Sequence, residues 1–446
     1  MSTRDDMRVA KRLMRLAKKY GATGVTCSVS SSTNEAIEVR DQCVEKFEAT
    51  IGERQLGLSV LVGKREASIE SECFGAQHCE RLVERVVAMA KVATENPYAA
   101  IAPRELWPCD PACLTEKEAF LERCDKNPPP RIGEMKALAL ELERSALHYP
   151  DVTKSSGASV SRGMGTSVFM TSEGFIAEHK GTSYTKSVSM IAARGSEMQS
   201  GGDYHSARHF ADLRSNEECA RRAGESAVML LGAKPIATQV MPVIFDPRVA
   251  VRILGWFFGA TNGRNVHFKS TFLLDKKYEQ LFPDDVTITD DPHIPRKFGS
   301  RLYDAECVKT ARHELVRNGR LMMWTTSMES GLMLGIPSSG HASGKSNLLL
   351  SFGSVTRAEL CRSVPTAFLV TGLLGHGPNI ATGDFSSGAE GLLLKDGEII
   401  HPVNEVTIAG NLLDMWKTMR HGSDREEYGS VSCPSLLFDR MTVSGA

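Results

Sequence analysis

Residues 382–416, TGDFSSGAEGLLLKDGEIIHPVNEVTIAGNLLDMW, decide how the second half of this chain folds. The pair Asp396-Gly397 stands there between two apolar runs, residues 392–394 and 398–401. Both central residues of a tight two-residue hairpin turn need positive φ, which Asp and Gly adopt more readily than most residues. The sequence therefore predicts a β-hairpin at this point.

The flanks of this hairpin carry further signals. Three glycines within residues 383–391 predict a polar loop before it. Residues 406–409 predict another strand, which Gly410-Asn411 ends ahead of a short helix at residues 412–419. None of these residues forms a catalytic signature, so the stretch indicates a framework rather than a reaction.

Length and composition are typical of a globular protein with two domains. A chain of 446 residues is too long for one ordinary core. Its net charge of -1 excludes the broad positive surface of a general nucleic-acid binder. No apolar run reaches the roughly 18 residues that span a membrane. Eleven cysteines without a secretory signal predict reduced thiols and a cytoplasmic location.

Residues 1–233 predict an N-terminal domain of antiparallel β-meanders with packed helices, and the boundary is expected near Lys234. A proline-rich segment, residues 98–130, predicts a long surface connection within this domain. The predicted strands are residues 24–30, 35–40, 44–50, 57–62 and several within 154–194, and the predicted helices are an N-terminal helix ending at Gly21 and residues 77–94, 132–148 and 216–231.

Residues 234–446 predict a mostly antiparallel β domain around one buried helix, which makes the whole chain α+β. A strand at residues 239–245 leads to Asp246-Pro247, where Asp can cap a helix and Pro suits its first position. The helix at residues 248–260 is apolar on nearly every side, a pattern typical of a helix without a solvated face.

Three patterns suggest chemistry, but a structural role is favoured for each. His205 and His209 are four residues apart, as in zinc proteases, yet Ser206 stands where the general base would be. Residues 340–346, GHASGKS, resemble a phosphate-binding loop with one residue too few between its glycines. An acidic cluster at residues 284–293 could attract a hard cation, although its prolines favour turns.

Several motifs of the second half resemble one known family. They are KSTFLLD at residues 269–275, DDPH at 290–293, YDAE at 303–306, TGDFS at 382–386 and TIAGNL at 407–412. Together they are similar to the TldD/PmbA family, and most closely to its PmbA branch, also called TldE. The resemblance covers most of residues 235–446, whereas the first 230 residues share only the order of elements.

In the TldD-like branch of that family, a His-Glu-x-x-x-His helix and a later cysteine hold a metal for peptide hydrolysis. The resemblance places the two helical ligand positions at Ile253 and Phe258, and the general base at Leu254. Residues 248–260 contain no His, Asp, Glu or Cys. Cys433 falls near the place of the metal cysteine, and it is expected to be a buried thiol.

The resemblance thus implies a non-catalytic, TldE-like subunit of a heterodimeric metalloprotease that acts on unfolded or extended peptides. A TldD-like partner would supply zinc or a similar metal, this chain would hold no cofactor, and the isolated chain could form a homodimer. The family is also linked to maturation of a ribosomally made peptide and to modulation of DNA gyrase.

Two alternatives stay open at this point. One is an active metallopeptidase with a non-standard metal site, for which His205, His209 and Cys433 are the candidate ligands. The other is a gyrase-modulating protein that binds its partner and acts alone.

Overall fold

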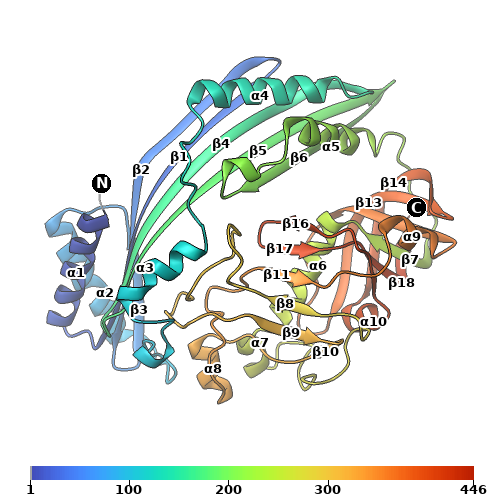
Figure 1. Ribbon diagram of the computed structural model, residues 1–446. Helices are drawn as coiled ribbons and strands as arrows, with labels where there is room; N and C mark the ends of the chain where they lie inside the picture. The colour runs from blue at the N-terminus through green and yellow to red at the C-terminus, as the bar shows by residue number, and fades with distance from the viewer. Residues whose placement is uncertain (1–2, 446) are drawn as a thin grey trace.

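One long antiparallel sheet forms the N-terminal half of the protein in the computed structural model, which describes residues 3–445 (Figure 1). Its strand order is β3-β2-β1-β4-β5-β6, so every strand pairs with a neighbour in an antiparallel ladder. The strands are β1 (Gly24–Arg40), β2 (Cys43–Val62), β3 (Arg65–Ser71), β4 (Val152–Thr171), β5 (Ile176–Arg194) and β6 (Glu197–Ala207).

The four short strands predicted over residues 24–62 are in fact two long ones, so that prediction is wrong in its boundaries. The polar residues 31–34 separate two of the predicted strands, but in the structure they continue β1 and pair with both β2 and β4. The extra residue Gly52 forms a bulge in β2, at a φ of 67°, without ending the strand. The real turn is Asp41-Gln42, where both residues have positive φ.

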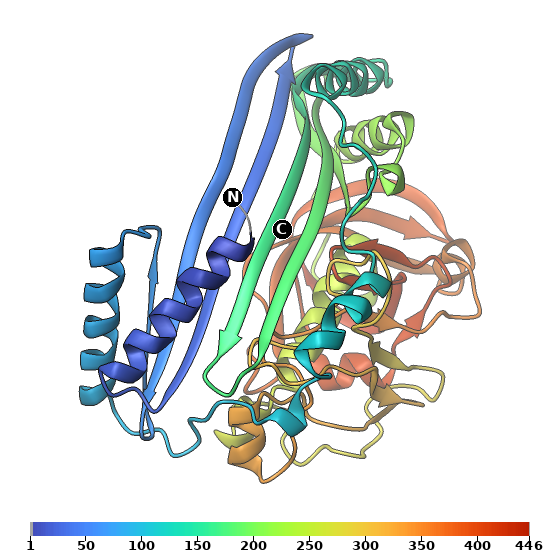
Figure 2. The same ribbon diagram turned by 60° about the vertical axis from the view of Figure 1, so that its left-hand side comes forward.

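Four helices pack on one face of this sheet. Val25 and Val29 of β1 lie in a core with α1 (Thr3–Lys19) and α2 (Ala76–Val92). Ile37 and Val39 of the same strand lie in a second core with α4 (Ile132–Leu147) and α5 (Asn216–Val228). Odd-numbered residues of one strand share a face, so both helix pairs cover the same side. Figure 2 shows α1 lying across the strands.

The opposite face of the sheet carries small hydroxyl side chains. Ser159 and Ser187 are hydrogen-bonded across β4 and β5 at 2.8 Å, and Thr185 and Ser206 are hydrogen-bonded across β5 and β6 at 2.8 Å. Because side chains alternate along each strand, this hydroxyl face also includes Ser28 and Ser30 of β1. Apart from Phe169 and Ala177, which pack against the C-terminal half, the face therefore offers hydrogen bonds and little apolar surface.

The connection at residues 98–130 is more structured than predicted. It contains η1 (Arg104–Leu106) and α3 (Pro111–Phe120), and Trp107 is buried against Phe175 at a ring distance of 5.2 Å. Cys109 and Cys113 are joined by a disulfide, so the prediction that all cysteines are reduced is wrong for this pair.

The C-terminal half contains two further sheets, which confirms the α+β, two-domain fold (Figure 1). One has the order β10-β9-β8-β11-β17-β16. The other has the order β14-β13-β12-β7-β18-β15, and an additional pairing of β14 with β18 closes five of its strands into a ring. Their strands are β7 (Gln239–Phe245), β8 (Ile288–Asp290), β9 (His313–Arg317), β10 (Arg320–Leu321), β11 (Leu348–Leu350), β12 (Thr366–Leu374), β13 (Asp384–Lys395), β14 (Glu398–Asn411), β15 (Arg420–His421), β16 (Glu426–Tyr428), β17 (Val431–Cys433) and β18 (Leu436–Ser444).

The hairpin predicted at Asp396-Gly397 is confirmed, since these residues join β13 to β14 with φ angles of 53° and 85°. The polar loop predicted before it is wrong, because β13 already begins at Asp384. Gly391 lies inside that strand for a steric reason: a Cβ there would lie 1.9 Å from the carbonyl oxygen of Leu369 in β12. Helix α10 (Leu412–Lys417) follows β14 as predicted.

The predicted strand and capped helix at the start of this half are confirmed as β7 and α6 (Pro247–Ala260). The Asp246 carboxylate accepts a hydrogen bond from the Arg248 amide at 3.0 Å. Three short helices follow α6 along the chain and precede the β13–β14 hairpin. They are α7 (Gly263–His267), α8 (Met328–Leu334) and α9 (Arg357–Arg362). Within residues 3–445, no helix has the length and apolar character needed to cross a membrane.

Candidate functional site

Helix α6 carries the three positions that the family resemblance singles out. Ile253, Leu254 and Phe258 are only 2%, 5% and 9% exposed, and all three belong to the main core of the C-terminal half. Cys433 lies in the same core with no exposed surface, and this burial raises the pKa of its thiol. These residue types do not fit a metal site, because three of the four have no donor atom.

Helix α6 nevertheless has one open face, which corrects the prediction of a helix buried on every side. Arg248, Arg252, Gly255 and Gly259 are partly exposed and recur at helical spacing. A Cβ built on Gly255 or Gly259 would meet no atom within 4 Å. The apolar and open faces of α6 are therefore adjacent, and the ligand positions lie on the apolar one.

The two histidines separate into different roles. His205 lies on β6, where its Nδ1 accepts a hydrogen bond from the Arg214 amide at 3.1 Å. His209 lies beyond that strand and is buried, with Nε2 2.7 Å from the carbonyl oxygen of Glu122 and Nδ1 3.7 Å from an Asp125 carboxylate oxygen. The expectation that both are solvated is thus wrong for His209.

The structure does not bring His205, His209 and Cys433 together as metal ligands. Among the described residues, no group of three or more His, Cys, Asp or Glu side chains is arranged to hold a metal ion. His205 and His209 both have an extended backbone. Two residues four positions apart are distant from each other along an extended backbone, whereas on a helix they would be neighbours on one face.

Most amides of the glycine-rich loop at residues 340–346 already donate to other groups of the protein. The amide of Ala342 donates to Asp304 and that of Ser346 to Asp290, at 3.0 and 2.8 Å. Asp290 is 1% exposed and also lies 3.2 Å from Nε2 of His341. Asp291 accepts a hydrogen bond from the His293 amide at 2.9 Å. Both the loop and these two carboxylates therefore have structural roles.

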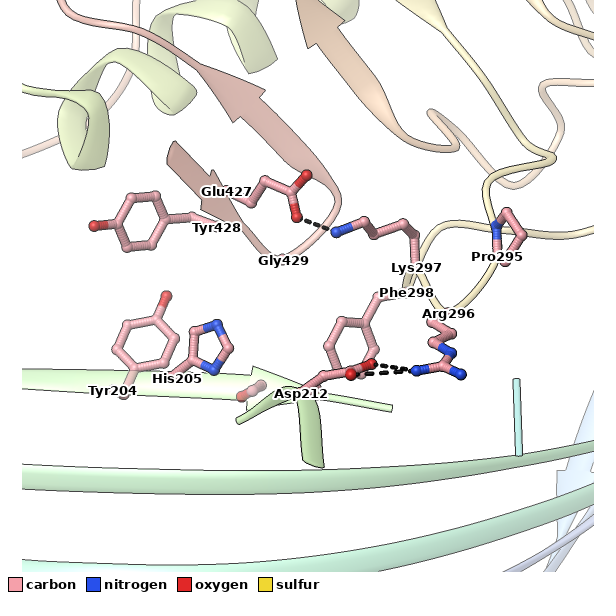
Figure 3. Close-up of a pocket in the computed structure, with 12 residues that line it drawn as sticks. Tyr204, His205, Asp212, Pro295, Arg296, Lys297, Phe298, Glu427, Tyr428 and Gly429 are labelled. Carbon is pink, nitrogen blue, oxygen red and sulfur yellow. Dashed lines mark hydrogen bonds and ion pairs between the residues drawn. The ribbon is translucent and has the colours of Figure 1, made fainter. Parts of the chain in front are cut away.

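A pocket of about 570 Å³ lies between the two halves of the protein (Figure 3). One wall is β6 and the other is β16, and each is the last strand of its sheet. Their outer edges are thus unpaired by any other strand in the described chain, so they can hydrogen-bond an added extended backbone. The lining residues are Tyr204, His205, Ser206, Ala207, Asp212, Pro295, Arg296, Lys297, Phe298, Glu427, Tyr428 and Gly429.

Charges in this interdomain pocket are paired with one another. Arg296 lies 3.3 Å from Asp212, and Lys297 forms an ion pair with Glu427 (Figure 3). His205 stays neutral near pH 7, because burial and the neighbouring Arg214 lower its pKa. Since its Nδ1 accepts a hydrogen bond, the proton lies on Nε2 and makes this nitrogen a donor. The pocket therefore offers hydrogen bonds without a net charge.

Only His205 among the lining residues was singled out from the sequence. The pocket exists because two strand edges distant in the chain face each other, and no local pattern reports which strand of a sheet is last. A partial signal was available in Tyr204 and Tyr428, since tyrosines are enriched at interaction surfaces.

A second pocket, of about 440 Å³, lies between the hydroxyl face and the C-terminal half. Its wall includes Glu306, whose carboxylate accepts a hydrogen bond from the Met328 amide at 2.5 Å. Burial raises the pKa of Glu306 to about 7, and the nearby carboxylates of Asp304 and Glu329 act in the same direction. This group therefore changes charge near neutral pH.

The free energy of unfolding is expected to fall by about 2–3 kcal/mol, through Glu306 alone, as the pH rises from about 4.5 to about 7. The folded state holds this proton more tightly than the unfolded state, so stability is greatest below the unfolded pKa. Urea unfolding of the wild type and of Glu306→Gln at several pH values checks this. A wild-type minus variant difference that is constant with pH would contradict it.

Comparison with known proteins agrees with this architecture. Residues 125–231 match the PmbA/TldA metallopeptidase central domain, and residues 238–445 match the PmbA/TldA metallopeptidase C-terminal domain. The metalloprotease PmbA of Escherichia coli O157:H7 is 32% identical over 428 residues, which cover 95% of this chain and 92% of that protein. A PmbA homologue of Haemophilus influenzae is 33% identical, covering 97% and 94%.

Two solved structures have the same fold. A protein of Bacteroides thetaiotaomicron, described only as a candidate modulator of DNA gyrase, superposes with a TM-score of 0.89 at 26% identity over 99% of both chains. TldE from Thermococcus kodakarensis superposes with a TM-score of 0.79 at 17% identity, covering 98% of this chain and all of that one. The chain belongs to the PmbA/TldD family of metallopeptidases, and within it to the PmbA branch.

Proposed function

We propose that this chain is a non-catalytic, TldE-like subunit of a two-chain metalloprotease. In this proposal a TldD-like partner supplies the metal and hydrolyses the peptide bond. This chain completes the binding site for extended or unfolded peptides. No step of the hydrolysis is assigned to its own residues.

The observation that carries the proposal is the chemistry of α6. A metal-dependent peptidase needs nitrogen, sulfur or oxygen ligands and a group that can take a proton from water. Ile253 and Phe258 offer no ligand atom, Leu254 offers no base, and buried Cys433 belongs to no group of three or more potential metal ligands among the described residues. Retention of the family framework together with loss of the ligands supports a role in assembly and binding.

The interdomain pocket supports the peptide-binding part of this role. Two unpaired strand edges border it, so a peptide could be held by main-chain hydrogen bonds, which do not depend on its sequence. Paired charges on the walls would neither select nor repel strongly charged segments. Unfolded chains of varied sequence are the ligands that such a pocket suits best.

Co-expression of this chain with a TldD-like protein tests the proposal. We expect the two to co-purify, with about one metal ion per pair bound to the partner, and only the pair to hydrolyse an unfolded peptide such as reduced casein. Replacing the partner's metal-ligand histidine should abolish this activity. Variants of this chain at Cys433 should keep it, provided that the pair still assembles.

Two results would favour the alternatives. Stoichiometric zinc and peptidase activity in this chain alone would establish an active enzyme, and loss of both in His205→Ala would identify its site. Binding to DNA gyrase without any TldD-like protein, combined with failure to co-purify with one, would instead support a binding protein that acts alone.

A further inference from the structure

A short segment of the C-terminal half, residues 295–298, contacts the N-terminal half beside the interdomain pocket. We refer to this segment as the strap. All four of its residues line that pocket (Figure 3). Arg296 has a φ of 64°, in the left-handed region that a residue with a Cβ adopts only at some cost. The strap is therefore held in its conformation by its surroundings rather than by local preference.

Ion pairs and hydrogen bonds from both halves hold the strap. Arg296 lies 2.6 Å from Glu122 and 3.3 Å from Asp212, while Lys297 pairs with Glu427. Arg208 donates to the carbonyl oxygens of Lys297 and Phe298 at 3.4 and 3.1 Å. The side chains of the three ion pairs are 38–45% exposed, so salt in the solvent screens them.

Apolar packing contributes little to this attachment. Within residues 3–445, none of the four strap residues belongs to any of the hydrophobic clusters of buried side chains and the apolar residues packed against them. Segments with few buried apolar contacts open locally at a lower free energy than the core. The strap thus combines a strained backbone with exposed ion pairs and a few hydrogen bonds, which come from Arg208 and from the Arg296 amide to the Leu121 carbonyl oxygen at 2.9 Å.

Lys297 of the strap also lines a small cavity of about 10 Å³ beside β17. Lys297 and Glu427 line both this cavity and the larger interdomain pocket, so their ion pair stands at the boundary between the two. Ser432 lines the small cavity, is 2% exposed and has a hydroxyl without a hydrogen-bond partner among the described residues. Its neighbour Cys433 faces the core on the other side of the strand.

We propose that the strap is a gate, whose opening joins the interdomain pocket to the cavity at Ser432 without unfolding the rest of the protein. The closed state is held by the ion pairs of Arg296 and Lys297, so salt or loss of their acceptors opens the gate. This gating belongs to the chain alone and does not depend on the proposed protease partner.

The test uses Ser432→Cys as a buried thiol probe and follows its modification by N-ethylmaleimide with peptide mass spectrometry. Adding Glu122→Gln, Asp212→Asn and Glu427→Gln removes the charged acceptors but keeps both basic residues. We expect the probe to react on the order of tenfold faster in this combined variant. Sodium chloride should accelerate the reaction in the parent and have little effect in the variant. Cys433 should stay unmodified in both.

A matched control is Asp439→Asn, which removes an ion pair with Arg420 at 2.6 Å and similar exposure, away from the strap. It should leave the probe's rate unchanged. Equal rates in the parent and the combined variant would overturn the gate, as would modification of the probe and Cys433 together, which signals global unfolding. If Ser432→Cys impairs folding, amide hydrogen exchange of residues 295–298 is compared between the natural protein and the variant with the three acceptor substitutions, both with Ser432. Faster exchange in the variant supports the gate, and equal exchange overturns it.

Discussion

Replacing Leu254 with glutamate is expected to lower the free energy of unfolding by at least about 4 kcal/mol at pH 7. The substitution introduces the residue type that the family resemblance implies for the catalytic branch at this position. Leu254 is 5% exposed and lies in the main core of the C-terminal half, so the carboxylate would lose its hydration without gaining a partner. The apolar face of α6 therefore resists conversion back to a catalytic helix.

The pH dependence of this loss identifies its cause. A buried carboxyl group has a raised pKa in the folded state, so the folded protein binds the proton more tightly than the unfolded chain. The Leu254→Glu variant should therefore approach the stability of Leu254→Gln below about pH 4 and become weaker as the pH rises. Urea unfolding at several pH values measures both variants.

Gly255→Glu is the matched control on the same helix. Its Cβ would meet no atom within 4 Å, so the new side chain can point away from the core and stay hydrated. We expect a change within about 1 kcal/mol, with little dependence on pH. Similar losses at both positions would show that α6 tolerates no carboxylate on any side, and would contradict the two-faced helix.

Replacing Trp416 with alanine is expected to cost about 3–5 kcal/mol. Its ring stacks on Phe282 at 4.9 Å and contacts Phe257 and Phe272 at 5.5 and 5.4 Å. The side chain is 1% exposed, and it connects the end of the β13–β14 hairpin to α6. Alanine would leave a cavity that these aromatic rings cannot fill completely.

Denaturant unfolding followed by far-ultraviolet circular dichroism measures this loss in the transition of the C-terminal half. Phe268→Ala serves as the control, because Phe268 is 58% exposed and its removal should cost less than about 1 kcal/mol. A Trp416→Ala protein as stable as this control would mean that the aromatic cluster contributes little to the core.

Features set by neighbouring residues could be predicted from the sequence. Asp396-Gly397 joins two strands as expected, with positive φ at both residues, and Asn318-Gly319 joins β9 to β10 by the same rule. Asp246 caps α6 as its residue type and the following proline predict. These signals succeed because the turn or cap is made by the residues that carry it.

Features set by distant residues could not be predicted in the same way. Gly391 and the hydroxyl-rich residues 30–34 resemble loop segments, yet both lie in long strands because neighbouring strands pair with them. The interdomain pocket depends on β6 and β16 being the last strands of two different sheets. The burial of the ligand positions on α6 agrees with the apolar pattern of its sequence, whereas the open face at Gly255 and Gly259 depends on which residues pack against the helix.

The hydroxyl face of the N-terminal sheet has a consequence for any chain that lies along it. Along β4 the side chains on this face are small from Ser159 to Ser167, so a bound segment shifted by two residues would meet nearly the same neighbours. The interaction energy along this part of the face would then be almost independent of register. A polypeptide bound by the proposed function could slide there, and its position would have to be fixed by contacts outside this stretch.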